Sequence, residues 1–272
     1  MAIQYDLKES VYRAEPACHA TSLKDWATNP QRAKAKADTP MVATPAMITG
    51  RLLHQFVLEP RRFKKEHFMA PACKRNTIAG RELYEAAITA NPGRDPVREE
   101  DWVQFEAMRE AVMEHPKGGA YLRCRGKAEV SVFWDDERTG LACKGRIDKL
   151  ATRQGAIIDL KTCQDASPRA VGRSVSQFNY HLQAAFYTDG LMANGFDDVQ
   201  FIFIFVEKTA PWSVSVVQLS DDYLAAGRRL YHKALNNYAM CHEADLFPGW
   251  DKIITLERPN WVEPWEQSKA PA

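Results

Sequence analysis

The chain has 272 residues, of which 45% are hydrophobic and 26% are charged, a composition typical of globular proteins with one large domain or two small ones. It excludes disordered, collagen-like and disulfide-stapled chains. The 36 Lys and Arg residues nearly balance the 35 Asp and Glu residues, so any affinity for nucleic acid has to come from local basic clusters.

The cysteines and apolar runs bear on the cellular compartment. The six Cys residues are scattered, with no CxxC pair and no Cys/His spacing of the kind that binds zinc or iron–sulfur clusters. No apolar run approaches the roughly 20 residues that span a bilayer, and the starting sequence MAIQYDLKES lacks the apolar core of a signal peptide. We therefore expect a cytoplasmic protein with reduced thiols and no membrane contact.

The first 120 residues are predicted to be mainly helical. Apolar residues recur with helical spacing over 45–58, and Pro60 is expected to stop that helix. A shorter helix is expected to start at a Thr21-Ser22 cap and end before Pro30, followed by a polar, basic connection, QRAKAKADTP. Two more helical patterns cover about 77–90 and 98–115.

From residue 129 onward the pattern changes to strands. Three strands of an antiparallel meander are predicted over 129–134, 140–150 and 156–162, and two more over 200–207 and 212–219. Helices are predicted over about 174–194 and, behind a Ser220 cap, 221–242. The first of these would be a crossover, so we expect an α/β fold with a mixed sheet flanked by helices. We take 1–272 as one domain, with a helical part (1–120) and a core (121–265).

The predicted register of the meander places charged residues together. With loops at 135–140 and 152–155, residue 134 faces 141 and residue 151 faces 156. Opposed residues, and residues two apart, share a face, and a slip by one residue would scatter them. The predicted pairs are Glu129 with Arg146, Asp148 with Asp159, and Arg146 with Lys161, all on one face.

Two explanations for this cluster remain open at this level. Carboxylates directly opposite each other destabilise a sheet unless a cation neutralises them. Arg146 and Lys161 could do so as an ordinary ladder of ion pairs. Alternatively, the carboxylates hold a divalent cation, and oxygen ligands of this kind suit Mg²⁺ or Mn²⁺.

The local sequences around these residues resemble a known family. GRID followed by DLK on an apolar strand resembles the signature of the PD-(D/E)xK nucleases, with Ile147 in place of the motif's proline, and QAAFY resembles the QxxxY element of the RecB-like and phage exonuclease branches. CKGRIDKL, YHLQAAFYTDGL, GRLLHQFVLEP and ATSLKDWATNP are similar to the RecE-type enzymes, exodeoxyribonuclease VIII. The resemblance runs from about Thr21 to Trp261 and implies a restriction-endonuclease-like core.

The resemblance also implies a metal site. Asp148, Asp159 and the backbone carbonyl of Leu160 would bind one or two Mg²⁺ ions, with Mn²⁺ as a substitute. His54 corresponds to the additional metal ligand of the RecE-type branch, and Glu129 to an acidic position that helps to hold a second metal or a water.

Three further residues receive roles from the same resemblance. Lys161 would orient the attacking water and stabilise the charge that grows on the phosphate. Gln183 and Tyr187 would support the site or contact the DNA backbone.

Basic runs are usually solvated surface, but beside a nuclease site they become candidates for phosphate contacts. These candidates are Arg51, Arg61, Arg62, Lys64, Lys65 and Arg146, and more weakly Arg123, Arg125 and Lys127.

The implied activity is Mg²⁺-dependent 5′→3′ degradation of one strand of linear double-stranded DNA to mononucleotides, leaving 3′ single-stranded tails for recombination. By resemblance, the enzyme would be a ring-shaped homo-oligomer, would work with a phage-type single-strand annealing protein and would act in a bacterial or phage-infected cell. Two alternatives stay open. One is a single-strand-specific exonuclease or an endonuclease of the same superfamily. The other is a DNA-end-binding protein without catalysis, which the presence of Asp148, Asp159 and Lys161 disfavours.

Overall fold

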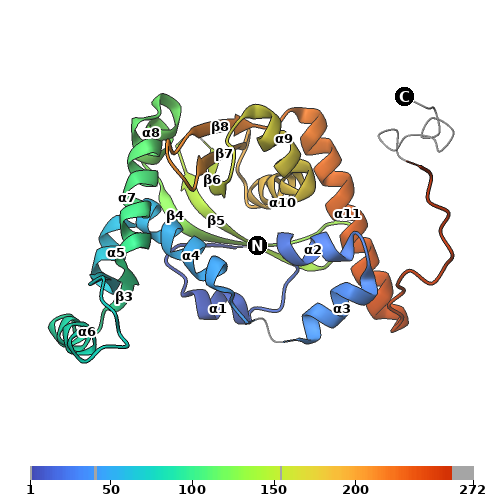
Figure 1. Cartoon of the computed structure of the whole chain (residues 1–272). Helices are drawn as coiled ribbons and strands as arrows, with labels where there is room; N and C mark the ends of the chain where they lie inside the picture. The colour runs from blue at the N-terminus through green and yellow to red at the C-terminus, as the bar shows by residue number, and fades with distance from the viewer. Residues whose placement is uncertain (1, 40–41, 154, 259–272) are drawn as a thin grey trace, which may run out of the picture.

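The computed structural model describes residues 2–39, 42–153 and 155–258, and is built around a six-stranded mixed sheet with helices on both faces (Figure 1). The strand order is β1-β4-β5-β6-β7-β8, in which only the β6–β7 pair is parallel. This confirms the predicted α/β class and the mixed sheet. The strands are β1 (Ala2–Gln4), β4 (Lys127–Asp135), β5 (Ala142–Ala151), β6 (Ala156–Cys163), β7 (Gln200–Glu207) and β8 (Val214–Gln218).

Two hydrophobic cores lie on the two faces of the sheet, and β7 contributes to both. Its Phe201, Phe203 and Phe205 pack into one core, and its Ile204 and Val206 into the other. A strand buried on both faces reads as a continuous apolar run, which explains the sequence QFIFIFVE. The first core is covered by α2 (Ala20–Trp26), α9 (Pro168–Gln177), α10 (Tyr180–Ala193) and α11 (Asp221–Ala244), and the second by α4 (Pro45–Leu58), α5 (Pro60–Glu66), α7 (Glu99–Glu114) and α8 (Pro116–Arg123).

The crossover from β6 to β7 consists of two helices rather than one. We predicted a single helix over 174–194, but α9 already begins at Pro168, behind the Ser167 N-cap, and ends at Gln177. The chain then turns through Asn179, which has a left-handed backbone with φ 50°. Asn tolerates this conformation better than most residues. The turn sets the direction of α10.

The N-terminal half differs from the prediction at its helix boundaries. The cap of α2 is His19, whose side chain accepts from the backbone of Ser22, so Thr21-Ser22 lies inside the helix. The predicted basic connection forms α3 (Pro30–Asp38) behind the Asn29 cap. Pro60 stops α4 but also begins α5, because a proline at the first helical position loses no hydrogen bond.

Several smaller elements were not predicted. They are α1 (Glu9–Ala14), β1, the parallel pair β2 (His67–Ala70) and β3 (Asp95–Arg98), α5 and α8. The predicted helices near 77–90 and 98–115 are confirmed as α6 (Ile78–Ala90) and α7. Figure 1 shows α6 projecting from the body. No helix in the described ranges is both long and apolar enough to cross a membrane. Trp261, where the resemblance ends, lies outside these ranges.

The register of the meander is confirmed for β5–β6 and wrong for β4–β5. Ala151 pairs with Ala156 as predicted, but the ladder ends at Lys149 and Ile158, so Asp148/Asp159 and Arg146/Lys161 are not ladder pairs. In β4–β5 the residue opposite Arg146 is Ser131, two positions from Glu129.

The register error has a local cause in the turn. Asp135 still belongs to β4 and pairs with Ala142. The Asp136 side chain accepts hydrogen bonds from the backbone and hydroxyl of Thr139 over 2.9 and 2.7 Å, so the turn lies one residue later than predicted and the partner of each β4 residue moves by two positions.

The alternation of side chains is interrupted near Asp148. Ile147 and Leu150 are three residues apart yet pack in the same core. Glu129, at the level of Asp148 on the neighbouring strand, has a left-handed φ of 53°. Strict alternation through this point, which we assumed, is therefore wrong. The distortion occurs where the candidate site begins.

Candidate active site

The candidate site lies where β5 and β6 separate, just beyond the end of their ladder. Asp148 comes from β5, and Asp159 and Lys161 come from β6. Oδ2 of Asp148 accepts a hydrogen bond from the backbone N–H of Leu160 over 2.9 Å. This bond positions the carboxylate in the fork and brings both predicted carboxylates together.

Asp159 is the most deeply buried member, with its side chain 2% exposed. It forms an ion pair with Lys161, which lies two residues further along the same strand. Its Oδ1 accepts a hydrogen bond of 2.6 Å from Nε2 of Gln183 on α10. Its buried Oδ2 has no hydrogen bond of regular geometry. The crossover helix therefore fixes one oxygen of this carboxylate, and the Lys161 ammonium faces the other.

His54 reaches the site from α4, on the other side of the sheet from α10. Its Nδ1 lies 3.2 Å from Oδ2 of Asp148, the oxygen that also contacts the Leu160 backbone. The residue thus joins the two carboxylates, as the family resemblance implied. The contact involves a residue 94 positions earlier in the chain, and composition or periodicity could not reveal it.

Glu129 and Arg146 form an ion pair of 2.6 Å beside these residues. Arg146 also donates to the Leu7 carbonyl over 3.2 Å and lies over the Tyr12 ring. Glu129, His54 and Arg51 help to line a hollow of about 290 Å³ at the surface. This hollow gives the site an open side.

Tyr187 supports the site through packing. Gln183 and Tyr187 are four residues apart, so they share one face of α10. The ring of Tyr187 lies against Gly145 of β5, where an added Cβ would be 2.9 Å from the ring Cε1. Only glycine leaves room for this ring beside Asp148's strand.

Burial and charge shift the pKa values of the carboxylates and of Lys161. Burial raises the pKa of Asp159 to about 6, and Asp148 adds to this increase while Lys161 opposes it. For Asp148, burial is outweighed by His54, Lys161 and the Leu160 N–H, so its pKa is lowered. Burial lowers the pKa of Lys161, but Asp159 and Asp148 raise it by more, so the pKa is raised overall. The site thus holds one readily ionised carboxylate, one reluctant carboxylate and a firmly protonated lysine.

The pKa values of His54 and Glu129, at the edge of the site, are shifted by the charge of Asp148. Burial lowers the pKa of His54, but the Asp148 carboxylate outweighs it, so the pKa is raised overall. Burial raises the pKa of Glu129, and Asp148 adds to the increase although the Arg146 side chain opposes it. Negative charge is therefore concentrated at Asp148.

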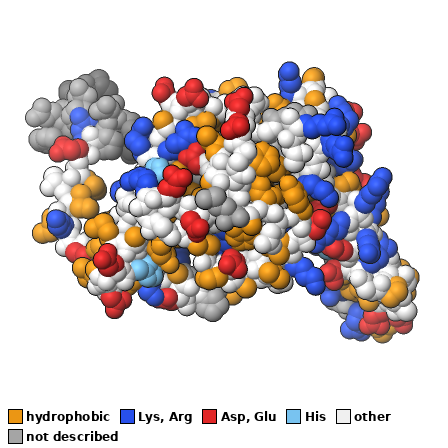
Figure 2. All heavy atoms as spheres, turned by 180° about the vertical axis from the view of Figure 1, so that it is seen from behind, with side chains coloured by type: hydrophobic (Ala, Val, Ile, Leu, Met, Phe, Trp, Pro, Cys, Tyr) orange, Lys and Arg blue, Asp and Glu red, His pale blue; other side chains and the backbone are white. Residues whose placement is uncertain are grey.

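The basic candidates are distributed unevenly. Arg51 is exposed beside the hollow, with one nitrogen 3.6 Å from Glu9. Arg62 pairs with Glu59 and Glu66, and Arg146 is committed to Glu129. Figure 2 shows Lys and Arg side chains gathered toward the end of the molecule that carries α5, α7 and α8. The remaining candidates are exposed and stay predictions: Arg61, Lys64, Lys65, Arg123, Arg125 and Lys127.

Sequence reasoning missed two residues next to the site. The ammonium of Lys161 lies 5.1 Å from the centre of the Tyr180 ring, and that of Lys24 lies 5.2 Å from the same ring. Tyr180 precedes Gln183 by three residues and so shares its helix face, which could have revealed it. Nothing in the sequence around Lys24 indicates its position.

The donor set fits a hard divalent cation in its chemistry. Two carboxylates and an imidazole are present, and the buried Oδ2 of Asp159 already faces a cation, the Lys161 ammonium. The side chains contact each other instead of a common point: within the described ranges no three His, Cys, Asp or Glu residues are grouped closely enough to hold a metal. Ion binding at this fork would therefore require small rotations of these side chains.

A comparison with protein families identifies the domain that carries Asp148, Asp159 and Lys161. Residues 20–254 match the family described as a PDDEXK-like domain of unknown function, DUF3799. The chain belongs to this family. The matched region includes every residue of the candidate site and places the fold in the PD-(D/E)xK superfamily.

A solved structure shares the fold of this chain. A candidate exonuclease from Eubacterium rectale is 14% identical and gives a TM-score of 0.65, with 99% of this chain and 100% of that chain covered. A phage-related exonuclease from Haemophilus somnus, also 14% identical, gives a TM-score of 0.35 over 86% of this chain and 98% of that chain. No curated protein sequence matches significantly. At these identities the first structure shows the fold alone.

Proposed function

We propose that this PDDEXK-like protein is a metal-dependent DNA nuclease, and specifically a 5′→3′ exonuclease of the RecE type. The observation that carries the proposal is the fork between β5 and β6, where Asp148, Asp159 and Lys161 meet His54 and Gln183. A phosphodiester needs an attacking hydroxide, a cation at the phosphate and help for the leaving oxygen. These residues would hold the cation that supplies the first two, and a second ion in the same site would assist the leaving oxygen.

The metal site would be formed by Asp148, Asp159, His54 and the Leu160 carbonyl. Mg²⁺, or Mn²⁺ in its place, would supply an activated water and a Lewis acid at the phosphate oxygen. Asp148, with its lowered pKa, is ionised and ready to bind at neutral pH. Gln183 holds the Asp159 carboxylate in one orientation through its 2.6 Å hydrogen bond.

Lys161 would act on the substrate directly. Its ammonium stays protonated because the two aspartates raise its pKa, so it donates hydrogen bonds and does not act as a base. Two residues from Asp159 on one strand, it can hold the attacking water and a phosphate oxygen side by side. Charge that develops on the phosphate is thereby stabilised at a fixed position.

The finer assignment rests on sequence resemblance. His54 on α4 and the Gln183/Tyr187 pair on α10 correspond to RecE-type positions, which supports attack at duplex ends, 5′→3′ polarity and mononucleotide products. A ring-shaped homo-oligomer and a phage-type annealing protein as partner belong to the same proposal. An exonuclease of this kind would act in the cytoplasm of a bacterial or phage-infected cell.

The test is digestion of linear duplex DNA labelled separately at its 5′ and 3′ ends, beside covalently closed circles, with Mg²⁺ or EDTA. Wild type is compared with Asp159→Ala and with Asp222→Ala, an exposed acidic residue on α11. We expect early loss of the 5′ label as mononucleotide with Mg²⁺ only, intact circles, an inactive Asp159→Ala and an unchanged Asp222→Ala.

Each other outcome selects a different function. Cleavage of closed circles would identify an endonuclease, and activity restricted to single strands would identify the single-strand branch. Tight binding of DNA ends without cleavage would identify an end-binding protein. Full activity of Asp159→Ala would contradict the proposed metal site.

A further inference from the structure

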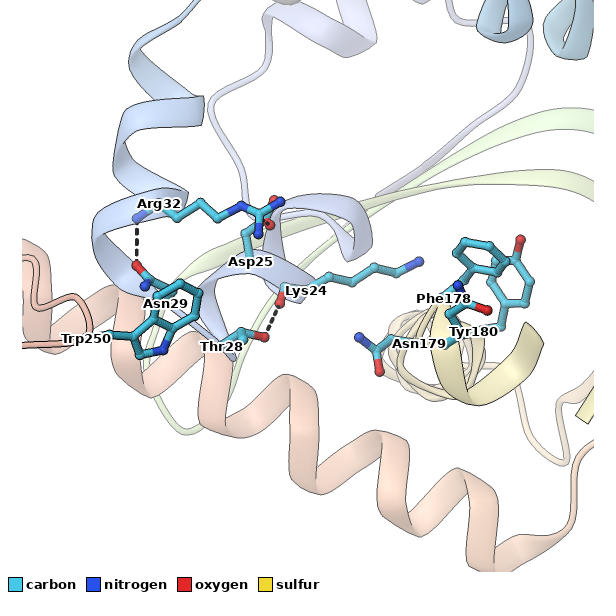
Figure 3. A pocket seen from close by; sticks show the side chains of 10 residues that line it. Lys24, Asp25, Thr28, Asn29, Arg32, Phe178, Asn179, Tyr180 and Trp250 are labelled. Carbon is cyan, nitrogen blue, oxygen red and sulfur yellow. Dashed lines mark hydrogen bonds and ion pairs between the residues drawn. The ribbon is translucent and has the colours of Figure 1, made fainter. Parts of the chain in front are cut away.

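A second hollow of about 540 Å³ lies beside the active site, between α2, the start of α3 and the turn from α9 to α10 (Figure 3). Lys24 extends across it toward Phe178 and Tyr180, and Asn179 points into the same space. Trp250 stands at the opposite side, next to Asn29. The lining is therefore a mixture of cationic, amide and aromatic groups, together with the carboxylate of Asp25.

The hollow is connected to the reacting centre through Tyr180. The ammonium groups of Lys24 and Lys161 lie 5.2 and 5.1 Å from the centre of this one ring. Lys161 is ion-paired to Asp159. A group bound by Lys24 would consequently lie next to a phosphate held by Lys161.

Lys24 carries a charge that the protein does not neutralise. Its ammonium has no ion pair within the described part of the chain, and the acid next to it, Asp25, is bound by Lys36 over 2.6 Å. Lys34, on the neighbouring helix, is paired with Asp38 over 2.7 Å. Burial lowers the pKa of Lys24 to about 8, and Lys161 adds to this decrease. A bound anion would stabilise the Lys24 ammonium against both its burial and its repulsion from Lys161.

The aromatic groups indicate what kind of anion fits. Phe178 is 48% exposed at the end of α9, and Trp250 is 67% exposed across the hollow. Exposed rings at a basic groove are the platforms on which proteins stack nucleobases. The amides of Gln177 and Asn179 also line the hollow and can donate to or accept from a base edge.

We propose that this hollow is a nucleotide subsite, in which Lys24 binds the phosphate next to the one that is cleaved while Phe178 and Trp250 contact the base. The assignment of DNA as the source of that phosphate rests on the proposed nuclease function. The subsite would place the end of the strand and so set which bond enters the fork.

The first test removes the charge either from Lys24 or from the DNA phosphate that it is proposed to bind. Duplexes carry either a 5′-hydroxyl in place of the terminal 5′-phosphate or one neutral methylphosphonate linkage on the 3′ side of the first cleaved bond, and initial cleavage is measured in single turnover. For wild type, we expect one of the two positions to slow cleavage about tenfold, equivalent to about 1.4 kcal/mol. Lys24→Met should be about tenfold slower on unmodified DNA and insensitive to the removal of charge at that same position. Lys34→Met, the control, should behave as wild type.

Two results would overturn the subsite. Equal rates of Lys24→Met and wild type on every duplex would show that Lys24 does not meet the DNA. Equal slowing of Lys24→Met on charged and neutral duplexes would show a structural role only, because the effect would not depend on the phosphate charge.

The second test needs no cleavage. Binding of 5′-phosphorylated tetrathymidylate is measured in EDTA, and we expect about tenfold weaker binding for both Lys24→Met and Phe178→Ala than for wild type. If wild type cleaves no DNA but this difference is present, the nuclease proposal fails and the subsite stands. Equal binding by all three proteins contradicts the subsite. If inorganic phosphate at the same concentration displaces the tetrathymidylate, the hollow binds anions in general, and the nucleotide assignment is overturned.

Discussion

The backbone N–H of Leu160 donates a hydrogen bond to Oδ2 of Asp148 over 2.9 Å, directly beyond the last residue pair of the β5–β6 ladder. A buried N–H needs a partner, and here a side chain supplies it where the opposite strand no longer does. The separation of the two strands therefore positions a carboxylate.

This bond allows charge and structure to be tested separately. Asp148→Asn keeps an oxygen for the Leu160 N–H but removes the negative charge, so nuclease activity should fall on the order of 10³-fold with little loss of stability. Asp148→Ala should be equally inactive and also less stable by about 1–3 kcal/mol, because the N–H is left unpaired. Single-turnover digestion and urea unfolding measure the two effects. Equal stability of the two variants would contradict the role of this bond.

Lys161 should not be replaceable by arginine. Its ammonium lies between Asp159 and the rings of Tyr180 and Phe203, and a planar guanidinium cannot occupy the position of a compact charge. We expect Lys161→Arg and Lys161→Met each to lose about 10²-fold or more in the rate of the chemical step, with DNA binding in EDTA reduced mainly for Met. Activity of the Arg variant within threefold of wild type would show that charge alone is sufficient.

Metal binding should stabilise the protein in a pH-dependent way. Burial raises the pKa of Asp159 to about 6, so this ligand is protonated below that pH and ionised above it. At pH 7.5, Mg²⁺ at 100 times its dissociation constant should add about 2.7 kcal/mol to the free energy of unfolding, and the gain should shrink below pH 6. Thermal unfolding with Mg²⁺ or EDTA checks this, and Asp159→Asn should show no gain at either pH.

His19 should make the fold sensitive to acid. Its Nδ1 caps α2 by accepting from Ser22, and burial lowers its pKa to about 4. Because protonation is easier in the unfolded chain, this contribution is complete above about pH 6.5 and is lost as the pH falls toward 4, up to about 3 kcal/mol. His19→Asn keeps a good cap but no group that titrates. Its free energy of unfolding, measured with urea, should therefore change less between pH 6.5 and 4 than that of wild type. Parallel pH curves for both proteins would contradict this role.

Gly145 should tolerate no side chain while Tyr187 is present. A Cβ at this position would lie 2.9 Å from the ring, so Gly145→Ala should cost about 1–3 kcal/mol of stability. In a Tyr187→Leu background the same change should cost at least 1 kcal/mol less. Equal costs in both backgrounds would show that the contact is unimportant.

Much of the core was predictable because its sequence signals are local. The strand 200–207 and the helix 45–58 have the predicted bounds, since a continuous apolar run marks the strand and a proline stop marks the helix. Asp148, Asp159, Lys161 and Gln183 came from a recognisable motif. The fork itself could not be predicted, because it depends on a left-handed Glu129 and on where the ladder ends. Lys24 lies near Lys161 through tertiary packing alone.

The β6–β7 pairing has a consequence for synthesis on the ribosome. Asp159 and Lys161 lie on a strand whose parallel partner is made only after the crossover that carries Gln183. Chains are made from the N-terminus and fold as domains emerge, so a chain released before residue 200 lacks the strand that covers β6. Products that terminate before residue 200 would thus lack the proposed activity, which would begin only in chains that contain β7.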